Sequence, residues 1–199
     1  MHTAIYQNTL LDEEGLIVLN GGADQVTPFP INDDGSLGQN DLQPGSTQTV
    51  PNATPSTTAG ATCTWPIRDA GMGGTYAFRI LSSSVVVPVE GSPFGGSGAA
   101  IAVTPNGKFV YVLSPDATVS GLAIDGPTGA LTPIAGAALP AGQNPTAIVI
   151  DAAGRFAYVP DVEGGTIFIY ALDANSGAIT PAGTVDVPGV VAIALRPPL

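Results

Sequence analysis

Short apolar runs alternate with turn sequences along most of this chain, and no window repeats its apolar residues at helical spacing. In the clearest stretch, strands are predicted at residues 99–103, 108–113, 118–124 and 130–134. These runs contain β-branched or aromatic residues, which favour strands. The turns between them include Thr104–Gly107 (TPNG) and Asp125–Gly129 (DGPTG), whose Gly and Asn residues readily adopt positive φ. The pattern predicts a meander of four antiparallel strands without a helix.

This unit, Thr104–Pro133, returns in the sequence as Asp151–Pro181. The matched pairs include Gly107 with Gly154, Tyr111 with Tyr158, Thr118 with Thr166, Gly129 with Gly177 and Pro133 with Pro181. Matched residues lie 47 or 48 positions apart, as 154 − 107 and 166 − 118 show. A repeat of about this length, built from short strands and Gly/Asp turns, is typical of a β-propeller blade.

Weaker copies of the unit precede these two. Asp12–Gly15 followed by LIVLN matches the turn and second strand of a blade, and Val26–Ile31 is the expected third strand. Pro28 and Pro30 remove ladder donors, so we expect that strand to lie at an edge or to be distorted. The predicted blade cores cover residues 12–39, 60–90, 107–134 and 154–182 of one repeat array spanning residues 1–199.

The second copy is incomplete. Residues 41–74 have the length of the missing part but lack a typical VYV-type second strand. One interpretation is a divergent surface loop, which the Ser, Thr, Pro and Gly content suits. The other is translation in a shifted reading frame, because the codons for Ala61–Ile67, read from their third bases, can encode Tyr-Val-Tyr-Val-Ala-Asn.

Five pieces of the chain resemble the lactonase-like seven-bladed propellers, a family of 6-phosphogluconolactonase-type and YVTN-type repeat proteins. They are DAAGRFAYV (151–159), GKFVYVLS (107–114), TVSGLAID (118–125), TGALTPIAG (128–136) and GSPF (91–94). The resemblance implies an all-β protein, a β-propeller of about four blades of four-stranded antiparallel sheets. It implies either a binding and interaction module or, as the alternative, hydrolysis of a sugar lactone.

Four blades form an array that is incomplete relative to a seven-bladed ring, so the chain is expected to be a fragment or to close differently. Residues 190–195 (VVAIAL) match inner strands and are predicted to start a further blade or to complete the first one. In an open arc, the end blades would expose apolar faces, which favours self-association through blade edges.

Charge and composition limit the classes of binding partner that we expect. The net charge of −11, with only five Lys and Arg residues, argues against nucleic acid or an anionic membrane surface. No run approaches the ~18 apolar residues of a membrane-spanning helix. A single cysteine, Cys63, allows no internal disulfide. No signal peptide is visible, so the protein is expected in the cytoplasm if its N-terminus is genuine, and secreted or at the surface if it is a fragment.

The candidate binding residues are acids in loops between second and third strands. In a propeller these loops and those joining successive blades lie on one face around the channel. The acids are Asp24, Asp69, Asp116 and Asp161, together with Glu163. Such a ring would give the channel mouth a negative potential and could bind a cation or the hydroxyls of a small sugar-like ligand. The alternative is that acids in exposed loops serve solubility and turn formation.

Catalytic residues are not identifiable from the sequence, and enzymatic activity is left open. The only histidine is His2, near the terminus, so neither a histidine base nor a histidine metal site is supported. Lys108 and Arg155 occupy the same repeat position, which indicates a role within the blade. No cofactor and no metal site are expected.

Overall fold

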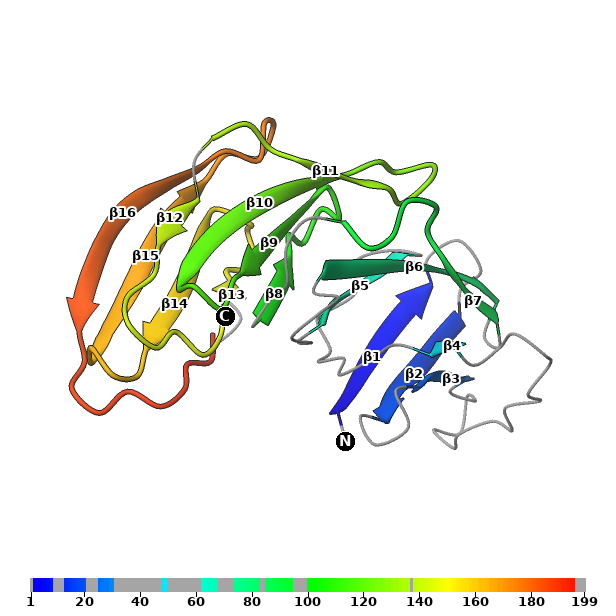
Figure 1. The fold of residues 1–199 in the computed structure, drawn as a ribbon, viewed down its shortest axis with the longest axis horizontal. Coiled ribbons are helices and arrows are strands. Elements are labelled where there is room, and N and C mark those ends of the chain that lie inside the picture. Colours follow the sequence, from blue (N-terminus) through cyan, green and yellow to red (C-terminus); the bar gives the residue numbers. More distant parts are fainter. Residues whose placement is uncertain are drawn as a thin grey trace. The chain divides into compact units, whose positions relative to one another are not determined.

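The computed structural model describes backbone strands at residues 2–8, 13–20, 25–30, 48–49, 62–67, 74–82 and 85–88. Side chains are described at Thr75 and Ala77 and at residues 88–94, 100–136 and 138–195. Every regular element in these ranges is a β-strand, and the strands form antiparallel meanders (Figure 1). The described part of the chain contains no helix that could cross a membrane.

The first sheet contains four strands in sequence order. They are β1 (His2–Asn8), β2 (Glu13–Asn20), β3 (Gln25–Pro30) and β4 (Gln48–Thr49). Strand β4 pairs only with Gln25 and Val26 of β3, so among the described strands Pro28 and Pro30 pair with β2 alone. Prolines are tolerated there because no second ladder requires the missing N–H.

The second sheet contains three strands, β5 (Thr62–Ile67), β6 (Gly74–Ser82) and β7 (Val85–Pro88). Strand β5 occupies the segment in which the sequence predicts no typical second strand, and it pairs with β6 over its whole length. Its Thr, Cys, Trp and Ile residues are compatible with a strand once a partner supplies the hydrogen bonds. The reading-frame hypothesis concerns the nucleotide sequence and stays a prediction.

The segment after β7 returns to the start of β6. The backbone N–H groups of Thr75 and Phe94 each donate to the other's carbonyl, at 3.0 and 2.8 Å. The N–H of Ala77 donates to Ser92 Oγ at 3.1 Å, and this hydroxyl donates to the Ala77 carbonyl at 3.2 Å. The GSPF piece therefore continues along the edge of β6 past the end of β7.

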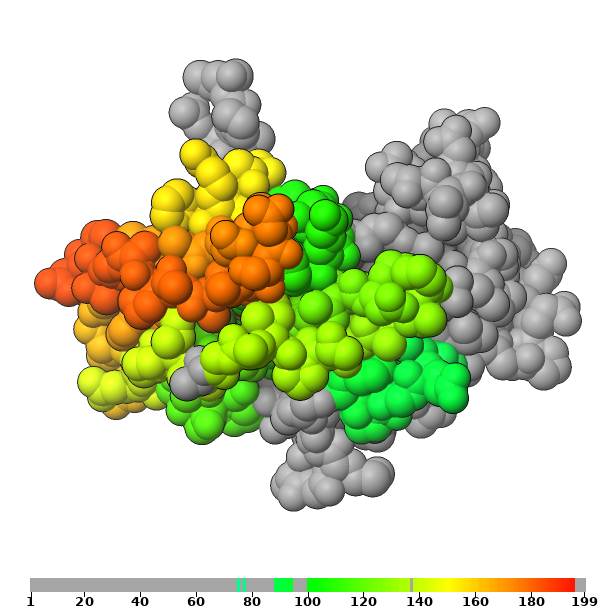
Figure 2. Space-filling view, turned by 90° about the horizontal axis from the view of Figure 1, so that it is seen from above, coloured from blue at the N-terminus to red at the C-terminus, as the bar shows by residue number. Residues whose placement is uncertain are grey.

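The third and fourth sheets are the two clear repeats. The third contains β8 (Ala100–Val103), β9 (Phe109–Leu113), β10 (Thr118–Ile124) and β11 (Leu131–Pro133), with β12 (Leu139–Pro140) also paired to β10. The fourth contains β13 (Val149–Ile150), β14 (Phe156–Asp161), β15 (Thr166–Leu172) and β16 (Ile179–Asp186). Strand β16 is mostly exposed, and its residues lie on the surface shown in orange in Figure 2.

Equivalent turns in the two repeats have equivalent hydrogen bonds. Gly129 and Gly177 have φ values of 75° and 70°, and their N–H groups donate to the carbonyls of Asp125 and Asp173. The Asp173 carboxylate accepts hydrogen bonds from the N–H groups of Asn175 and Ser176, at 3.0 and 2.7 Å. These glycines need positive φ, which explains their recurrence in the sequence.

The chain divides into two compact units, residues 1–97 with 125–131, and residues 98–124 with 132–199. The core of the second unit is formed by side chains of the third and fourth sheets. Tyr111 is fully buried there, and its hydroxyl donates to the Gly177 carbonyl at 2.9 Å. A Cβ at Gly177 would collide with Phe109 and Ile134. The outer turn of the fourth sheet thus packs directly against the third sheet.

The architecture confirms an all-β protein built from antiparallel sheets, and the first, third and fourth sheets each contain a meander of four strands. The boundaries of the blade cores stay predictions. Residues 190–195, predicted to be an inner strand, are assigned no strand in the structure. The first sheet has its own first strand, β1, so it does not depend on residues 190–195 for that strand. An isolated apolar run gains strand hydrogen bonds only when a neighbouring strand pairs with it.

Candidate functional site

The predicted acids differ in their surroundings. Asp24 and Asp69 lie outside the described residues. Asp116 is exposed in the turn between β9 and β10, where its carboxylate accepts a hydrogen bond from the Thr118 hydroxyl at 2.8 Å. Glu163 is exposed in the turn between β14 and β15. Asp161, by contrast, is only 2% exposed.

The Asp161 carboxylate is held by backbone N–H groups. Its Oδ2 accepts from Gln143 at 3.0 Å and its Oδ1 accepts from Asn144 at 2.8 Å. The N–H groups of Glu163 and Gly164 also donate to this carboxylate. These bonds connect the loop between β12 and β13 with the turn between β14 and β15.

Burial and hydrogen bonding act in opposite directions on Asp161. Burial raises the pKa of this carboxyl group, because a charged group loses its hydration. The hydrogen bonds from the four backbone N–H groups lower the pKa and outweigh burial, so the pKa lies below its usual value. Asp161 is therefore a carboxylate in the folded protein at neutral pH, and backbone groups occupy both of its oxygens.

Asp116 and Asp161 do not occupy equivalent positions, although the sequence places them 45 residues apart. Tyr111 and Tyr158 define an offset of 47, which aligns Asp161 with Ser114 and Glu163 with Asp116. The strand register agrees, because the Ser114 N–H donates to the Thr118 carbonyl and Asp161 pairs with Thr166. The second turn is one residue longer, which raises the repeat offset from 47 before the turn to 48 after it. The interval of 45 arises because Asp161 lies two residues earlier in its repeat than Asp116 does. Ligand binding by the predicted acids stays a prediction.

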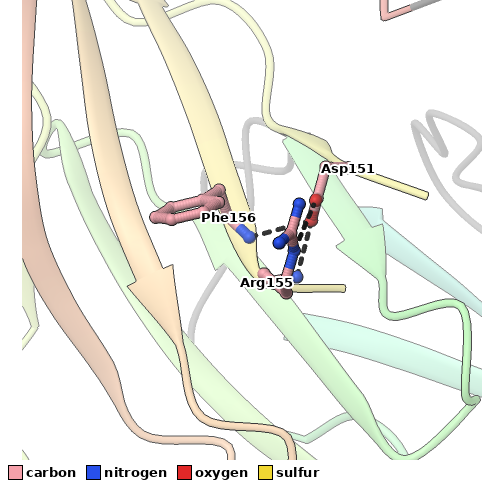
Figure 3. Close-up of polar contacts among 3 residues, drawn as sticks. All are labelled: Asp151, Arg155 and Phe156. Atoms are coloured by element: carbon pink, nitrogen blue, oxygen red, sulfur yellow. Dashed lines mark hydrogen bonds and ion pairs between the residues drawn. The ribbon is translucent and has the colours of Figure 1, made fainter. Parts of the chain in front are cut away.

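Two cations recur at one repeat position and belong to turns. The Arg155 guanidinium lies 3.5 Å from the Asp151 carboxylate, and its carbon is 5.8 Å from the centroid of the Phe156 ring (Figure 3). Asp151 Oδ1 also accepts from the N–H groups of Arg155 and Phe156 at 2.5 and 2.9 Å. In the preceding repeat the Lys108 N–H donates to the Asn106 side chain at 3.1 Å.

Two buried tyrosines connect parts of the second unit. Burial raises the pKa of Tyr111 to about 12, and the nearby Asp173 charge contributes to this rise. Burial also raises the pKa of Tyr170 to about 12, and its hydroxyl donates to the Pro140 carbonyl. Both phenols therefore stay protonated at neutral pH and donate hydrogen bonds to backbone carbonyls. These hydrogen bonds stabilise the fold of the second unit.

Gln143 and Asn144 were not among the residues singled out from the sequence. Their backbone N–H groups bind Asp161, while the residues themselves are exposed. The sequence does place them in a loop joining successive blades, on the same face as the acids. Nothing in residue type or spacing distinguishes them from other polar loop residues. In the part of the chain with described side chains, no three His, Cys, Asp or Glu residues gather as a metal site would require.

The comparison with protein families matches residues 75–195 to the lactonase, seven-bladed β-propeller family. This match covers more than half of the chain, so the chain belongs to that family. No curated protein matches the chain at a significant level. The family describes seven blades, whereas the described residues of this chain form four sheets.

Solved structures show the same fold. A candidate 6-phosphogluconolactonase from Bacteroides fragilis aligns with a TM-score of 0.62 and 21% identity, covering 93% of this chain and 55% of that chain. A second, from Bacteroides uniformis, aligns with a TM-score of 0.70 and 15% identity, covering 94% and 55%. The periplasmic gluconolactonase PpgL from Pseudomonas aeruginosa gives 0.50 and 15%, covering 94% and 70%. The chain thus spans about half the length of the first two structures.

Proposed function

We propose that this chain is a binding module that recognises a small polyhydroxylated ligand at the loop end of its sheets without hydrolysing it. The observation that carries the proposal is the state of Asp161. Its carboxylate accepts four backbone hydrogen bonds and is 2% exposed. A general base needs a lone pair directed at its substrate and a pKa near the working pH. Asp161 meets neither condition and instead fixes two loops.

The exposed polar groups around Asp161 support ligand binding. Asp161 holds the loop that carries Gln143 and Asn144 close to the turn that carries Glu163. Amide side chains offer both donors and acceptors, and a carboxylate offers acceptors, which together match the hydroxyl groups of a sugar. Loops held in one conformation lose little entropy when a ligand binds.

Hydrolysis of a sugar lactone is the second candidate. The family match and the structures described as gluconolactonases favour it. Lactone hydrolysis needs a group that activates water and a donor that stabilises the developing oxyanion. We therefore propose catalysis only for a longer protein, in which blades beyond the four described sheets supply the water-activating group and the oxyanion donor.

A binding module and a lactone hydrolase differ in whether the protein hydrolyses a sugar lactone. Purified protein should be titrated with gluconate and 6-phosphogluconate by calorimetry, and hydrolysis of glucono-1,5-lactone should be followed by proton release. Binding of a sugar acid without hydrolysis above the spontaneous rate is the expected result. Hydrolysis that scales with protein concentration would replace the binding proposal with the enzymatic one. The absence of both binding and hydrolysis would overturn both.

A protein partner is the other ligand class we propose, and a second copy of this chain is its simplest form. Val185, Val191 and Leu195 are exposed large apolar residues in and after β16. Exposed apolar residues favour association when they form part of a larger patch. Light scattering after size-exclusion chromatography should show a mass that rises with concentration. A constant monomer mass would contradict this proposal.

A further inference from the structure

The loop between β12 and β13 continues the sheet beyond the end of β13. The N–H of Val162 donates to the Asn144 carbonyl at 3.1 Å, and the N–H of Thr146 donates to the Pro160 carbonyl at 3.2 Å. Pro145 forms a single bridge with Asp161. The loop therefore follows β14 to its last residue, and its path is set by backbone hydrogen bonds.

The Asp161 side chain completes this arrangement at the tip of the loop. It satisfies the N–H groups of Gln143 and Asn144, the two residues that precede the bridge at Pro145. Two glycines make room for the carboxylate, because a Cβ at Gly142 or Gly164 would collide with it. Gly142 also has a φ of 102°, which other residues rarely adopt. The two glycines therefore allow four backbone N–H groups to surround the Asp161 carboxylate.

We propose that residues 142–146 form a recognition loop in which Gln143 and Asn144 contact a polyhydroxylated ligand, and that Asp161 is the residue that positions them. The ligand class rests on the function proposed above. Both residues are exposed, whereas their N–H groups are fixed. This separation leaves their side-chain amides available to a ligand and restricts the backbone from which they extend. Asp161 acts through this backbone and does not contact the ligand.

The positioning role is tested without a ligand by hydrogen exchange of single amides, measured by NMR on the full chain. Asp161→Asn keeps the size of the side chain but has one acceptor oxygen and no negative charge. We expect amide exchange at Gln143 and Asn144 to accelerate at least about tenfold, with no similar change at Val112 or Ala157 in the core. Unchanged exchange at the loop, or equal acceleration everywhere, would overturn the positioning role.

The recognition role is tested by calorimetric titration with gluconate and 6-phosphogluconate. The double variant Gln143→Ala, Asn144→Ala should weaken binding at least about tenfold and leave the melting temperature within about 1 °C. The matched control is Asn175→Ala, which removes an exposed amide from the turn between β15 and β16 and should bind like the wild type. Asp161→Asn should weaken binding as well.

The outcomes separate the two proposals. Wild-type binding that the double variant retains would overturn the recognition loop while the proposed function stands. Failure of the wild type to bind either sugar acid would overturn the proposed function and the recognition role together. The exchange measurement would still decide whether Asp161 positions the loop.

Discussion

The third and fourth sheets repeat one sequence pattern but bury it to different extents. All five residues of β9 are buried, whereas β14 alternates between buried and partly exposed residues over its first half. Tyr111 is fully buried and bonded to Gly177, while its repeat partner Tyr158 is only partly buried. The fourth sheet covers the face of the third sheet that carries Tyr111. The repeat residues therefore specify a blade, and the neighbouring sheet decides how deeply each of them is buried.

The same comparison applies to the turns that begin each second strand. In the third sheet the Thr104 hydroxyl accepts from the Phe109 N–H at 3.1 Å, and the Asn106 side chain accepts from Lys108. In the fourth sheet the single carboxylate of Asp151 performs both tasks. Different residues thus satisfy equivalent backbone groups, because a hydroxyl, an amide and a carboxylate can all accept hydrogen bonds.

The largest effect is expected at the contact between the two sheets. Gly177→Ala should lower the free energy of unfolding by about 3 kcal/mol, because it adds a Cβ against Phe109 and Ile134 at a φ of 70°. Gly189→Ala is the matched control, since Gly189 has a φ of 78° and open space around its Cβ position. It should cost about 1 kcal/mol. Equal losses in chemical denaturation would contradict the proposed packing effect.

The next largest effect on stability is expected for Asp161, compared with Asp116, the other described aspartate among the predicted binding residues. Asp161→Ala should cost about 2 kcal/mol, because it leaves buried N–H groups without an acceptor. Asp116→Ala removes an exposed carboxylate and should change stability by less than about 0.5 kcal/mol. Urea denaturation of both variants measures the difference, and a similar loss in the two would contradict the contrast in burial.

Asp161 should also make stability depend on pH. Its folded pKa lies below the unfolded value of about 3.9, so its stabilisation is present above that value. The stabilisation is lost as the pH falls from about 5 through the lower folded pKa. Glu163 is a second carboxyl group in the same turn, so Glu163→Gln serves as the background. In that background, Asp161→Asn should reduce the fall in the free energy of unfolding between about pH 5 and pH 3. The measurement covers the part of this range in which reversible unfolding can be followed. An unchanged slope would contradict the assignment.

A smaller effect is expected for the hydroxyl of Tyr111. Tyr111→Phe should cost about 1 kcal/mol, because it removes the buried donor to the Gly177 carbonyl. Tyr158→Phe should cost less than about 0.5 kcal/mol. The Tyr111 pKa of about 12 exceeds the unfolded value of about 10, so this stabilisation is present below pH 10 and is lost as the pH rises towards 12. Thermal melts of both variants test the comparison.

The smallest effect is expected at the surface ion pair. The Arg155 side chain is 71% exposed, so solvent screens its attraction to Asp151. Arg155→Ala should change stability by less than about 0.5 kcal/mol. Asp151→Ala should cost more, because it also removes the acceptor for two backbone N–H groups. A larger loss for the arginine variant in urea denaturation would reverse this ranking.

The sequence by itself determined the repeat, the strands and the turns of the two clear blades. Local chemistry suffices for these features, because glycines at positive φ and Asp side chains that accept from nearby N–H groups act within a few residues. The sequence did not reveal β5, whose residues need the pairing with β6 to form a strand. It predicted a strand at residues 190–195, where the structure assigns none, since an apolar run does not supply its own partner.

For the candidate site, the sequence identified Asp161 and Glu163 but not their different environments. Only the tertiary structure showed that Asp161 is buried beneath residues 142–144 and that Gln143 and Asn144 are the exposed members of this loop. Spacing along the chain aligned Asp161 with Asp116, but the repeat offset of 47 set by Tyr111 and Tyr158 aligns Asp161, the last residue of β14, with Ser114. Burial and hydrogen-bond partners come from segments that are distant in sequence, so residue type and spacing did not determine them.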